Sequence, residues 1–261
     1  MTATRLKNRA IVRLAPLEEA ENVREFLQGL VTNDVSCNLP VYAALLSAQG
    51  KAMFDFFVWD GGDGALLLDC EADTADDLAK RLSLYRLRRK IEIVVDPRVQ
   101  VRWELPQHQS GLIDSSPSGA ATDQHTLFAA DPRLRDLGYR LIVEATDDVV
   151  YADDAYLAHR LSLGIPEGRA ELGDILWLET NAVELNGVSF EKGCYIGQEN
   201  TARMNWRQKV NRRLVVVPLE ASQDKRQKVA YPELGFAVDH LRVADLDPAT
   251  LPEWQRAGIA D

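Results

Sequence analysis

One stretch of the chain places a thiol, two glycines and a lysine close together. The stretch is EKGCYIGQENTAR, residues 191–203, and in it Cys194 lies between Gly193 and Gly197. Glycine permits tight turns and positive φ, so the thiol is expected on a turn from which a helix can begin. A thiol near a helix N-terminus and beside Lys192 has a lowered pKa. The pattern predicts a reactive cysteine.

Two other interpretations of this cysteine stay open. Free cysteines are among the most buried residues, so Cys194 could be a small apolar residue packed under a glycine turn. A Cys–His hydrolase would need a positioned base, and the four histidines lie far from Cys194 in the sequence. The other cysteines, Cys37 and Cys70, form no C-x-x-C pair with it. This spacing favours a reducing compartment and predicts no disulfide framework and no bound metal.

Composition limits the class of protein. The chain has 261 residues, 46% of them hydrophobic, which predicts two packed units or one elaborated α/β body. A net charge of −10 disfavours stable nucleic-acid binding. No apolar run approaches the roughly 18 residues of a membrane span. We expect a soluble monomer, and the lack of an Arg/Ser-rich presequence predicts the bacterial cytoplasm.

The predicted elements mix helices and strands without a strict alternation, which favours an α+β fold over a doubly wound parallel sheet. The segment at 106–126, rich in Gln, Ser and Gly, is predicted to be a loop. Helices are predicted at 20–31, 73–90 and 153–163, and strands at 10–14, within 41–70 as a three-stranded meander, and at 91–95, 99–105, 138–145, 188–190, 214–220 and 234–246.

The thiol stretch also resembles a known signature. GVSFEKGCYIGQENTAR, residues 187–203, closely resembles the K-G-C-[FY]-x-G-Q-E motif of the YgfZ branch of the glycine-cleavage T-protein (GcvT) superfamily. That branch contains folate-binding proteins that assist iron–sulfur cluster assembly and repair. FLQGLVTNDV, LLSAQGKAMFDFFVW and DPRLRDLGYRL extend the resemblance over roughly the first four-fifths of the chain. The fixed positions of the motif are Lys192, Gly193, Cys194, Tyr195, Gly197, Gln198 and Glu199.

The resemblance implies a cloverleaf of discontinuous α/β subdomains around a central opening that holds tetrahydrofolate, followed by a small β-barrel. Residues 1–211 would form the folate-binding region as two interleaved subdomains. Residues 212–261 are fewer than the barrel usually takes, so we expect an abbreviated barrel.

Several residues acquire expected roles from the resemblance. Asp55 would lie by the folate nitrogens, although a strand residue at this spacing could equally face solvent. Glu171 would accept two hydrogen bonds from the pterin, with Glu167 as a substitute. Asn33 would line the pocket or act as a turn residue. The remaining expected folate-binding residues are Lys192, Gln198 and Arg203.

A basic cluster follows the motif. Between positions 203 and 213 there are positive charges and no acid, and such a cluster could receive the glutamate tail of a folate, bind an RNA backbone, or simply solubilise the surface. Its members are Arg203, Arg207, Lys209, Arg212 and Arg213.

The leading hypothesis is a tetrahydrofolate-binding accessory protein, not a conventional enzyme, that serves iron–sulfur client or assembly proteins. Cys194 would be its functional thiol, in transient contact with a cluster. The alternative is a folate-dependent aminomethyltransferase or demethylating enzyme that uses Asp55. A stable cluster carrier is disfavoured, because three dispersed cysteines supply too few thiolate ligands.

Overall fold

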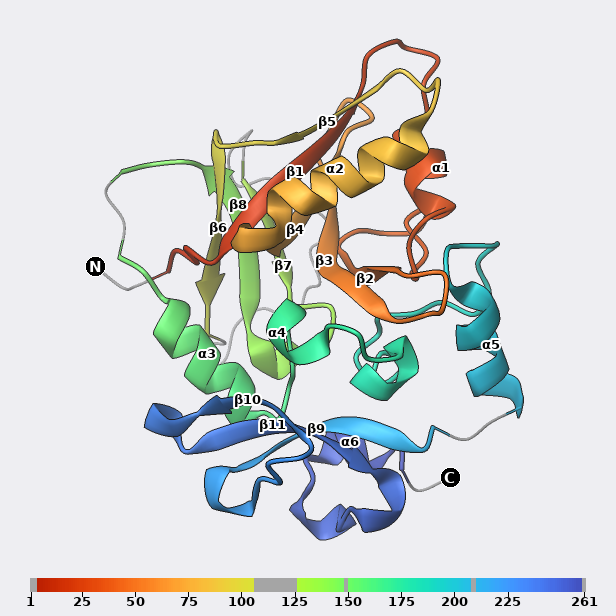
Figure 1. Ribbon diagram of the computed structural model, residues 1–261. Coiled ribbons are helices and arrows are strands. Elements are labelled where there is room, and N and C mark those ends of the chain that lie inside the picture. The colour runs from red at the N-terminus through yellow and green to blue at the C-terminus, as the bar shows by residue number, and fades with distance from the viewer. Residues whose placement is uncertain (1–3, 106–125, 148–149, 208–209, 260–261) are drawn as a thin grey trace, which may run out of the picture.

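The chain folds into three antiparallel sheets with helices packed around them (Figure 1). The computed structural model describes residues 4–105, 126–147, 150–207 and 210–259. The strand orders are β2-β3-β4-β1-β5, β6-β8-β7 and β10-β11-β9. The mixed α+β architecture expected from the sequence is confirmed.

The first sheet contains the meander predicted within 41–70. Its outer face packs on two helices, so the sheet is apolar on both sides. Phe56 and Val58 pack toward the helices, whereas Phe57 and Trp59 pack toward the centre of the protein, as the two-residue period of a strand requires. The elements are β1 (Arg9–Pro16), α1 (Val23–Gln28), β2 (Val41–Leu46), β3 (Ala52–Asp60), β4 (Leu66–Glu71), α2 (Ala75–Arg86) and β5 (Ile91–Val95).

The second sheet shares a core with the first, and residues 191–203, here called the thiol segment, lead into the helix α5. Its strands share one apolar core with the first and third sheets, through Val101, Ile142 and Leu214 among others. The elements are β6 (Val99–Glu104), β7 (Leu127–Ala130), β8 (Tyr139–Glu144), α3 (Asp153–Ser162), α4 (Arg169–Leu172) and α5 (Gln198–Arg207).

The C-terminal sheet is open. It has three strands, and no closed barrel forms in the parts of the chain that the structure describes, which confirms the expected abbreviation. Its first strand begins at Arg212, but whether 1–211 and 212–261 are separate domains stays a prediction. The elements are β9 (Arg212–Pro218), β10 (Gln227–Tyr231), β11 (Phe236–Arg242) and α6 (Glu253–Arg256).

Short 3-10 turns connect these elements, and none of the helices described is both long and apolar enough to cross a membrane. The turns are η1 (Ala72–Thr74), η2 (Arg135–Leu137), η3 (Trp177–Thr180), η4 (Leu219–Ala221), η5 (Pro232–Leu234), η6 (Val243–Asp245) and η7 (Pro248–Thr250).

The structure corrects some sequence predictions. Residues 188–190 form no strand; Ser189 donates one backbone hydrogen bond to the carbonyl oxygen of Thr32, at 3.0 Å, so the segment is pinned by a single bond instead of a ladder. The edge strands β7 and β10 were missed, because short edge strands lack a strong apolar alternation. The loop predicted at 106–126 lies almost entirely outside the described residues.

Candidate functional site

The thiol of Cys194 is exposed, and the residues on either side of it are anchored in the protein. Lys192 and Tyr195 are 7% exposed, and the Lys192 ammonium lies 5.1 Å from the centre of the Tyr195 ring. Cys194 itself is exposed, so it is not the buried apolar residue that one interpretation expected. Two buried anchors therefore present one thiol to solvent.

Lys192 fixes the thiol segment to the end of α1. Its ammonium donates to the carbonyl oxygens of Gln28 at 2.7 Å, Val31, and Asn33 at 3.0 Å. Carbonyl groups at a helix C-terminus lack intrahelical partners and carry partial negative charge, so a cation is favoured there. Burial lowers the pKa of Lys192 to about 8. All the donors of this ammonium are used in holding the loop.

Gly197 brings the thiol segment against the turn between β2 and β3. Its φ is +80°, and a Cβ on it would lie 2.6 Å from the carbonyl oxygen of Ser47 and 3.0 Å from the Cα of Gly50. Asn200 adds a hydrogen bond to the carbonyl oxygen of Gln49, at 2.8 Å. Only glycine fits this approach, whereas Gly193, on the other side of the thiol, has open space around it.

Asn33 has the turn role that the sequence left open. Its side-chain amide donates to the carbonyl oxygens of Tyr42 at 2.8 Å and Asn186 at 2.7 Å. Its amide oxygen accepts from the N–H of Asp34 at 2.9 Å. Because the side chain is committed on both ends to backbone groups, it joins two loops near Cys194.

Asp55 faces the centre of the protein, not solvent, because it shares a strand face with Phe57 and Trp59. Its carboxylate accepts from the Tyr42 hydroxyl at 3.2 Å and lies 3.5 Å from the N–H of Gly168. Burial, and then the negative charge of Glu167, raise the pKa of Asp55 to about 6. Among the described residues no arginine forms an ion pair with this carboxylate, so Asp55 is a carboxyl group that can change protonation near neutral pH.

Beside Asp55 lies a central ion cluster of three arginines and three carboxylates, whose side chains are at most 8% exposed. Arg140 joins two of the carboxylates, with its guanidinium 3.0 Å from Asp69 and 2.9 Å from Asp131. The formal charges of the cluster balance, which is the condition under which buried ions are tolerated. The members are Arg9, Asp69, Asp131, Arg133, Arg140 and Glu167.

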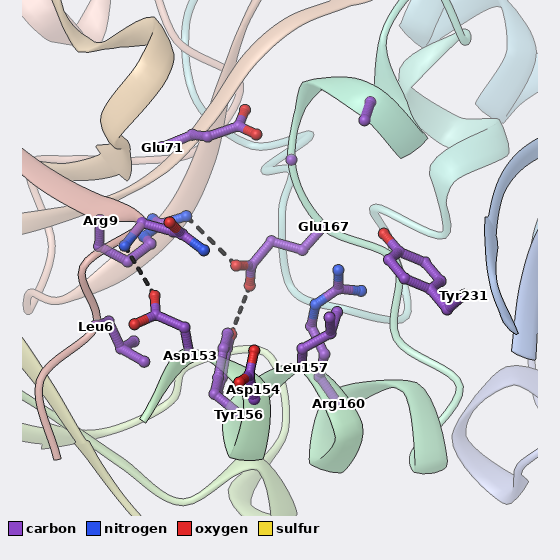
Figure 2. Close-up of a pocket in the computed structure, with 13 residues that line it drawn as sticks. Leu6, Arg9, Glu71, Asp153, Asp154, Tyr156, Leu157, Arg160, Glu167 and Tyr231 are labelled. Carbon is purple, nitrogen blue, oxygen red and sulfur yellow. Dashed lines mark hydrogen bonds and ion pairs between the residues drawn. The ribbon is translucent and has the colours of Figure 1, made fainter. Parts of the chain in front are cut away.

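Glu167 is the carboxylate at which these arginines converge. It lies 2.6 Å from Arg133 and 3.4 Å from Arg9, and it accepts from the Tyr156 hydroxyl at 2.6 Å. Figure 2 shows its carboxylate between Arg9 and Tyr156. Burial alone would raise the pKa of Glu167, but Arg133, Arg9 and Arg140 outweigh it and hold that pKa well below the ordinary value.

Glu171, the residue expected to bind the pterin, is also fully engaged. Its two oxygens accept from the guanidinium of Arg160, at 2.6 and 3.1 Å, from the N–H of Glu167 at 2.9 Å, and from the hydroxyl of Tyr231. A carboxylate has about four lone-pair sites, and all are used. Glu171 therefore ties α3 to α4 and to the C-terminal sheet.

A cavity of about 260 Å³ opens next to this region. Glu71, Asp153, Asp154 and Glu167 give its wall four acids against the two bases Arg9 and Arg160 (Figure 2). Ligand pockets usually measure about 300–1,000 Å³. The cavity is thus small for tetrahydrofolate, and Glu171 has no free acceptor position for a pterin. The described residues around this cavity do not fit the expected cofactor in this arrangement.

The other expected site residues lie away from this cavity. Gln198 begins α5, and Arg203 pairs with Glu199 on the exposed surface of that helix, at 3.1 Å. The basic cluster is divided, since Arg213 is 5% exposed and pairs internally with Glu184 at 2.8 Å. Lys209 lies outside the described residues. The structure therefore separates two regions, the thiol segment with Asn33 and Lys192, and the central cluster with Asp55 and Glu171.

Sequence reasoning missed the central arginines, although a repeated tripeptide marks one of them. Asp-Pro-Arg occurs at 96–98 and 131–133. At each place the arginine donates from two nitrogens to the aspartate two residues earlier, at 2.9 and 2.7 Å for Arg98 and 3.0 and 2.9 Å for Arg133. Only the second pair is buried on both sides, because β8 and β3 enclose it; the Arg98 side chain is 75% exposed.

No group of three His, Cys, Asp or Glu side chains gathers as a metal site in the parts of the chain that the structure describes. Among these described residues, Cys194 therefore has no companion ligands for a cluster.

The fold is that of the glycine-cleavage aminomethyltransferases. The structure superposes on the glycine cleavage system aminomethyltransferase T from Bartonella henselae with a TM-score of 0.62, at 13% identity, over 92% of this chain and 78% of that one. No family model matches the sequence. At this identity the likeness establishes the fold alone.

The sequence has clearer relatives. It is 32% identical over 243 residues to "Iron-sulfur cluster assembly factor IBA57, mitochondrial" from Mus musculus, covering 84% of this chain and 66% of that protein. The Homo sapiens protein of that name is 33% identical over 243 residues, covering 82% and 65%. The Neurospora crassa homologue is 30% identical over 239 residues, covering 81% and 52%. The chain is a GcvT-fold relative of the IBA57 iron–sulfur cluster assembly factors.

These relatives also correct the localisation expected from the sequence. The chain spans just under two thirds of the length of the mouse and human proteins. All three relatives are named as mitochondrial, which contradicts the bacterial cytoplasm expected from the sequence. None of the three carries the YgfZ name, so that branch stays a prediction.

Proposed function

We propose that the protein is an accessory factor for iron–sulfur cluster assembly or repair, and that Cys194 is its working thiol. The proposed process comes from the relatives, since they are named as iron–sulfur cluster assembly factors. The choice of Cys194 rests on its position, because its thiol is exposed while Lys192 and Tyr195 on either side of it are buried. A fixed, accessible thiol suits brief ligation of a cluster held by another protein.

In this proposal the cluster is cargo. Cys194 releases its proton to solvent and supplies one thiolate to an iron atom, and the other ligands come from the client or assembly protein. When the cargo leaves, the iron–thiolate bond breaks and the thiol takes up a proton. The protein holds no cluster permanently, in keeping with the single exposed cysteine on this segment.

Tetrahydrofolate binding stays a prediction of the sequence resemblance and is not needed for this role. The four hydrogen bonds that Glu171 already accepts argue against a pterin in the central cavity. They also weaken the alternative of an Asp55-dependent aminomethyltransferase, because that reaction requires the folate acceptor to lie beside Asp55.

The test compares two exposed cysteines. Wild type, Cys194→Ser and Cys37→Ser would be incubated anaerobically with ferrous iron, sulfide and glutathione as an exogenous thiol, and visible absorbance followed. We expect wild type and Cys37→Ser to develop cluster absorbance and Cys194→Ser to lose most of it. The three proteins would also be expressed in cells lacking the native chain, with the activity of an iron–sulfur enzyme as readout. Equal behaviour of Cys194→Ser and wild type in both assays would contradict the role of this thiol.

A further inference from the structure

A second cavity, of about 350 Å³, lies between the first and second sheets. In Figure 1, β1 of the first sheet lies beside β6 of the second, and the inner faces of these sheets share one apolar core. The apolar part of the cavity continues that core and consists of Leu67, Val99, Leu127 and Ile142. Ligand pockets usually measure about 300–1,000 Å³, so this cavity has room for a small molecule.

The strand register places one base and one acid on opposite walls of this cavity. Arg13 on β1 lies directly opposite Leu67 on β4, which faces the shared core. Glu144 on β8 lies directly opposite Val99 on β6, which packs against the same core. Residues directly opposite each other in an antiparallel pair share a face of the sheet. Arg13 and Glu144 therefore both project toward the space between the sheets, and both line the cavity.

The other two charged residues of the cavity satisfy each other. Arg98 donates to Asp96 from two side-chain nitrogens, at 2.9 and 2.7 Å, and from its backbone N–H at 3.0 Å. Arg13 has only one ion-pair partner among the described residues, Glu92 at 3.3 Å, and such half-exposed pairs are weak. Within the same part of the chain the exposed Glu144 forms no ion pair. A ligand in this cavity thus meets one available cation and one available anion.

These charges and the apolar wall match a small zwitterion with an apolar body. A guanidinium group donates two parallel hydrogen bonds to a carboxylate, and an ammonium group donates to a carboxylate in turn. An α-amino acid carries both charged groups on one carbon, together with a side chain that can occupy the apolar part of the cavity. A ligand that is only anionic would be repelled by Glu144, and one that is only cationic would be repelled by Arg13.

We propose that the cavity between the first and second sheets binds a free α-amino acid with an apolar side chain. Arg13 binds its carboxylate, Glu144 binds its ammonium group, and the apolar wall surrounds its side chain. This site goes beyond the proposed function, because it uses neither Cys194 nor the central ion cluster.

The test is equilibrium dialysis of the full chain against radiolabelled L-leucine. We expect wild type to bind it, and Arg13→Gln and Glu144→Gln each to weaken binding about tenfold or more, since each loses a charge-assisted hydrogen bond. Both variants replace side chains that reach solvent, so they are expected to fold. Arg242→Gln and Glu233→Gln, at exposed residues near the C-terminal sheet, are the matched controls and should bind as wild type does.

Edited ligands assign each contact. N-acetyl-leucine lacks the ammonium group and leucinamide lacks the carboxylate, so both should bind wild type more weakly than leucine. Glu144→Gln is expected to weaken the binding of leucine but not that of N-acetyl-leucine. Arg13→Gln is expected to weaken the binding of leucine but not that of leucinamide. Glycine, which has no side chain for the apolar wall, should bind at least tenfold more weakly than leucine.

Three outcomes would overturn the proposal. The first is a wild-type protein that binds no leucine at millimolar concentration. The second is leucine binding that Arg13→Gln and Glu144→Gln both leave unchanged, which would place the ligand elsewhere. The third is tighter binding of octanoate, octylamine or leucyl-leucine than of leucine, because the site would then suit a ligand with one charge or a peptide. None of these measurements involves iron or the thiol, so their failure would leave the proposed function standing.

Discussion

The ammonium group of Lys192 lies 2.7 Å from the carbonyl oxygen of Gln28, at the C-terminal end of α1. Lys192 belongs to the same motif as Cys194, yet it points away from the thiol and into the protein. The charge of Lys192 holds the thiol segment in place. The motif therefore combines the thiol of Cys194 with residues that position it.

Replacing Lys192 is therefore expected to destabilise the protein. Lys192→Met keeps the aliphatic stem but removes a charged donor from three carbonyl groups, and we expect a loss of about 2–3 kcal/mol in the free energy of unfolding. Urea denaturation would measure it. Lys51→Met, at an exposed lysine, is the matched control and should change stability little. A Lys192→Met protein as stable as wild type would show that the anchor is dispensable.

The two glycines of the motif are expected to differ. Gly197→Ala places a Cβ 2.6 Å from the carbonyl oxygen of Ser47 at a positive φ. Strain and displacement together predict a loss of about 2–4 kcal/mol. Gly193→Ala meets nothing within 4 Å and should be tolerated. Thermal unfolding of the two variants would compare them, and equal melting temperatures would refute the close approach.

The repeated Asp-Pro-Arg tripeptide gives a paired test of burial. Asp131→Asn leaves the three buried arginines of the cluster with only two carboxylates, and an uncompensated charge in the interior costs about 3–5 kcal/mol. Asp96→Asn breaks the same local contact to Arg98, whose side chain is 75% exposed, and should cost at most about 1 kcal/mol. Chemical denaturation at neutral pH would measure both, and similar losses would mean that the central cluster is not energetically special.

Asp55 is expected to make stability depend on pH. Its pKa is about 6 in the folded protein, against 3.8 for the ordinary carboxyl group. Between these two pH values the folded state keeps Asp55 protonated more than the unfolded state does. The resulting contribution to the free energy of unfolding is fully present below about pH 4 and is lost as pH rises through about 6. Asp55→Asn cannot ionise, so it should exceed wild type by about 1–3 kcal/mol above that range and match it at low pH. Denaturation at several pH values would measure this, with Asp63→Asn, at an exposed aspartate, as the control. If Asp55→Asn has the same dependence of unfolding free energy on pH as wild type, Asp55 is not buried as described.

Calorimetry with tetrahydrofolate tests whether the protein binds folate, as the sequence resemblance implies, or does not, as the geometry of the cavity indicates. We expect no measurable binding heat with wild type, because Glu171 already uses its acceptor positions and the cavity is only about 260 Å³. A known folate-binding protein titrated with the same solution would confirm that the ligand is intact. Binding that weakens in Asp55→Ala would instead support the folate pocket expected from the sequence.

Much of the fold could be predicted from the sequence. The meander within 41–70, the helices now seen as α2 and α3, and the strand β11 follow from local apolar periodicity. The resemblance, together with the shortness of the C-terminal region, predicted an abbreviated barrel. The edge strands β7 and β10 could not be found in this way, since their pairing comes from distant strands more than from their own pattern.

The thiol segment was identified from its residue types and spacing, because glycines, a cysteine and a lysine within eight positions act locally. The expected ligands for folate depended on residues far apart in the chain. Whether Glu171 is free or saturated is decided by Arg160 on α3 and Tyr231 on β10.

The sequence by itself thus determined the position of the thiol between two glycines and the mixed α+β class. The tertiary structure decided that this thiol is exposed. Only the tertiary structure decided which charges meet. Four members of the cluster come from four separate segments of the chain: Arg9, Asp69, Arg140 and Glu167. Each is of a residue type that is usually found on the surface. A buried charge survives only with an opposite charge beside it, and that partner is fixed by how the sheets pack, which no local pattern in the sequence encodes.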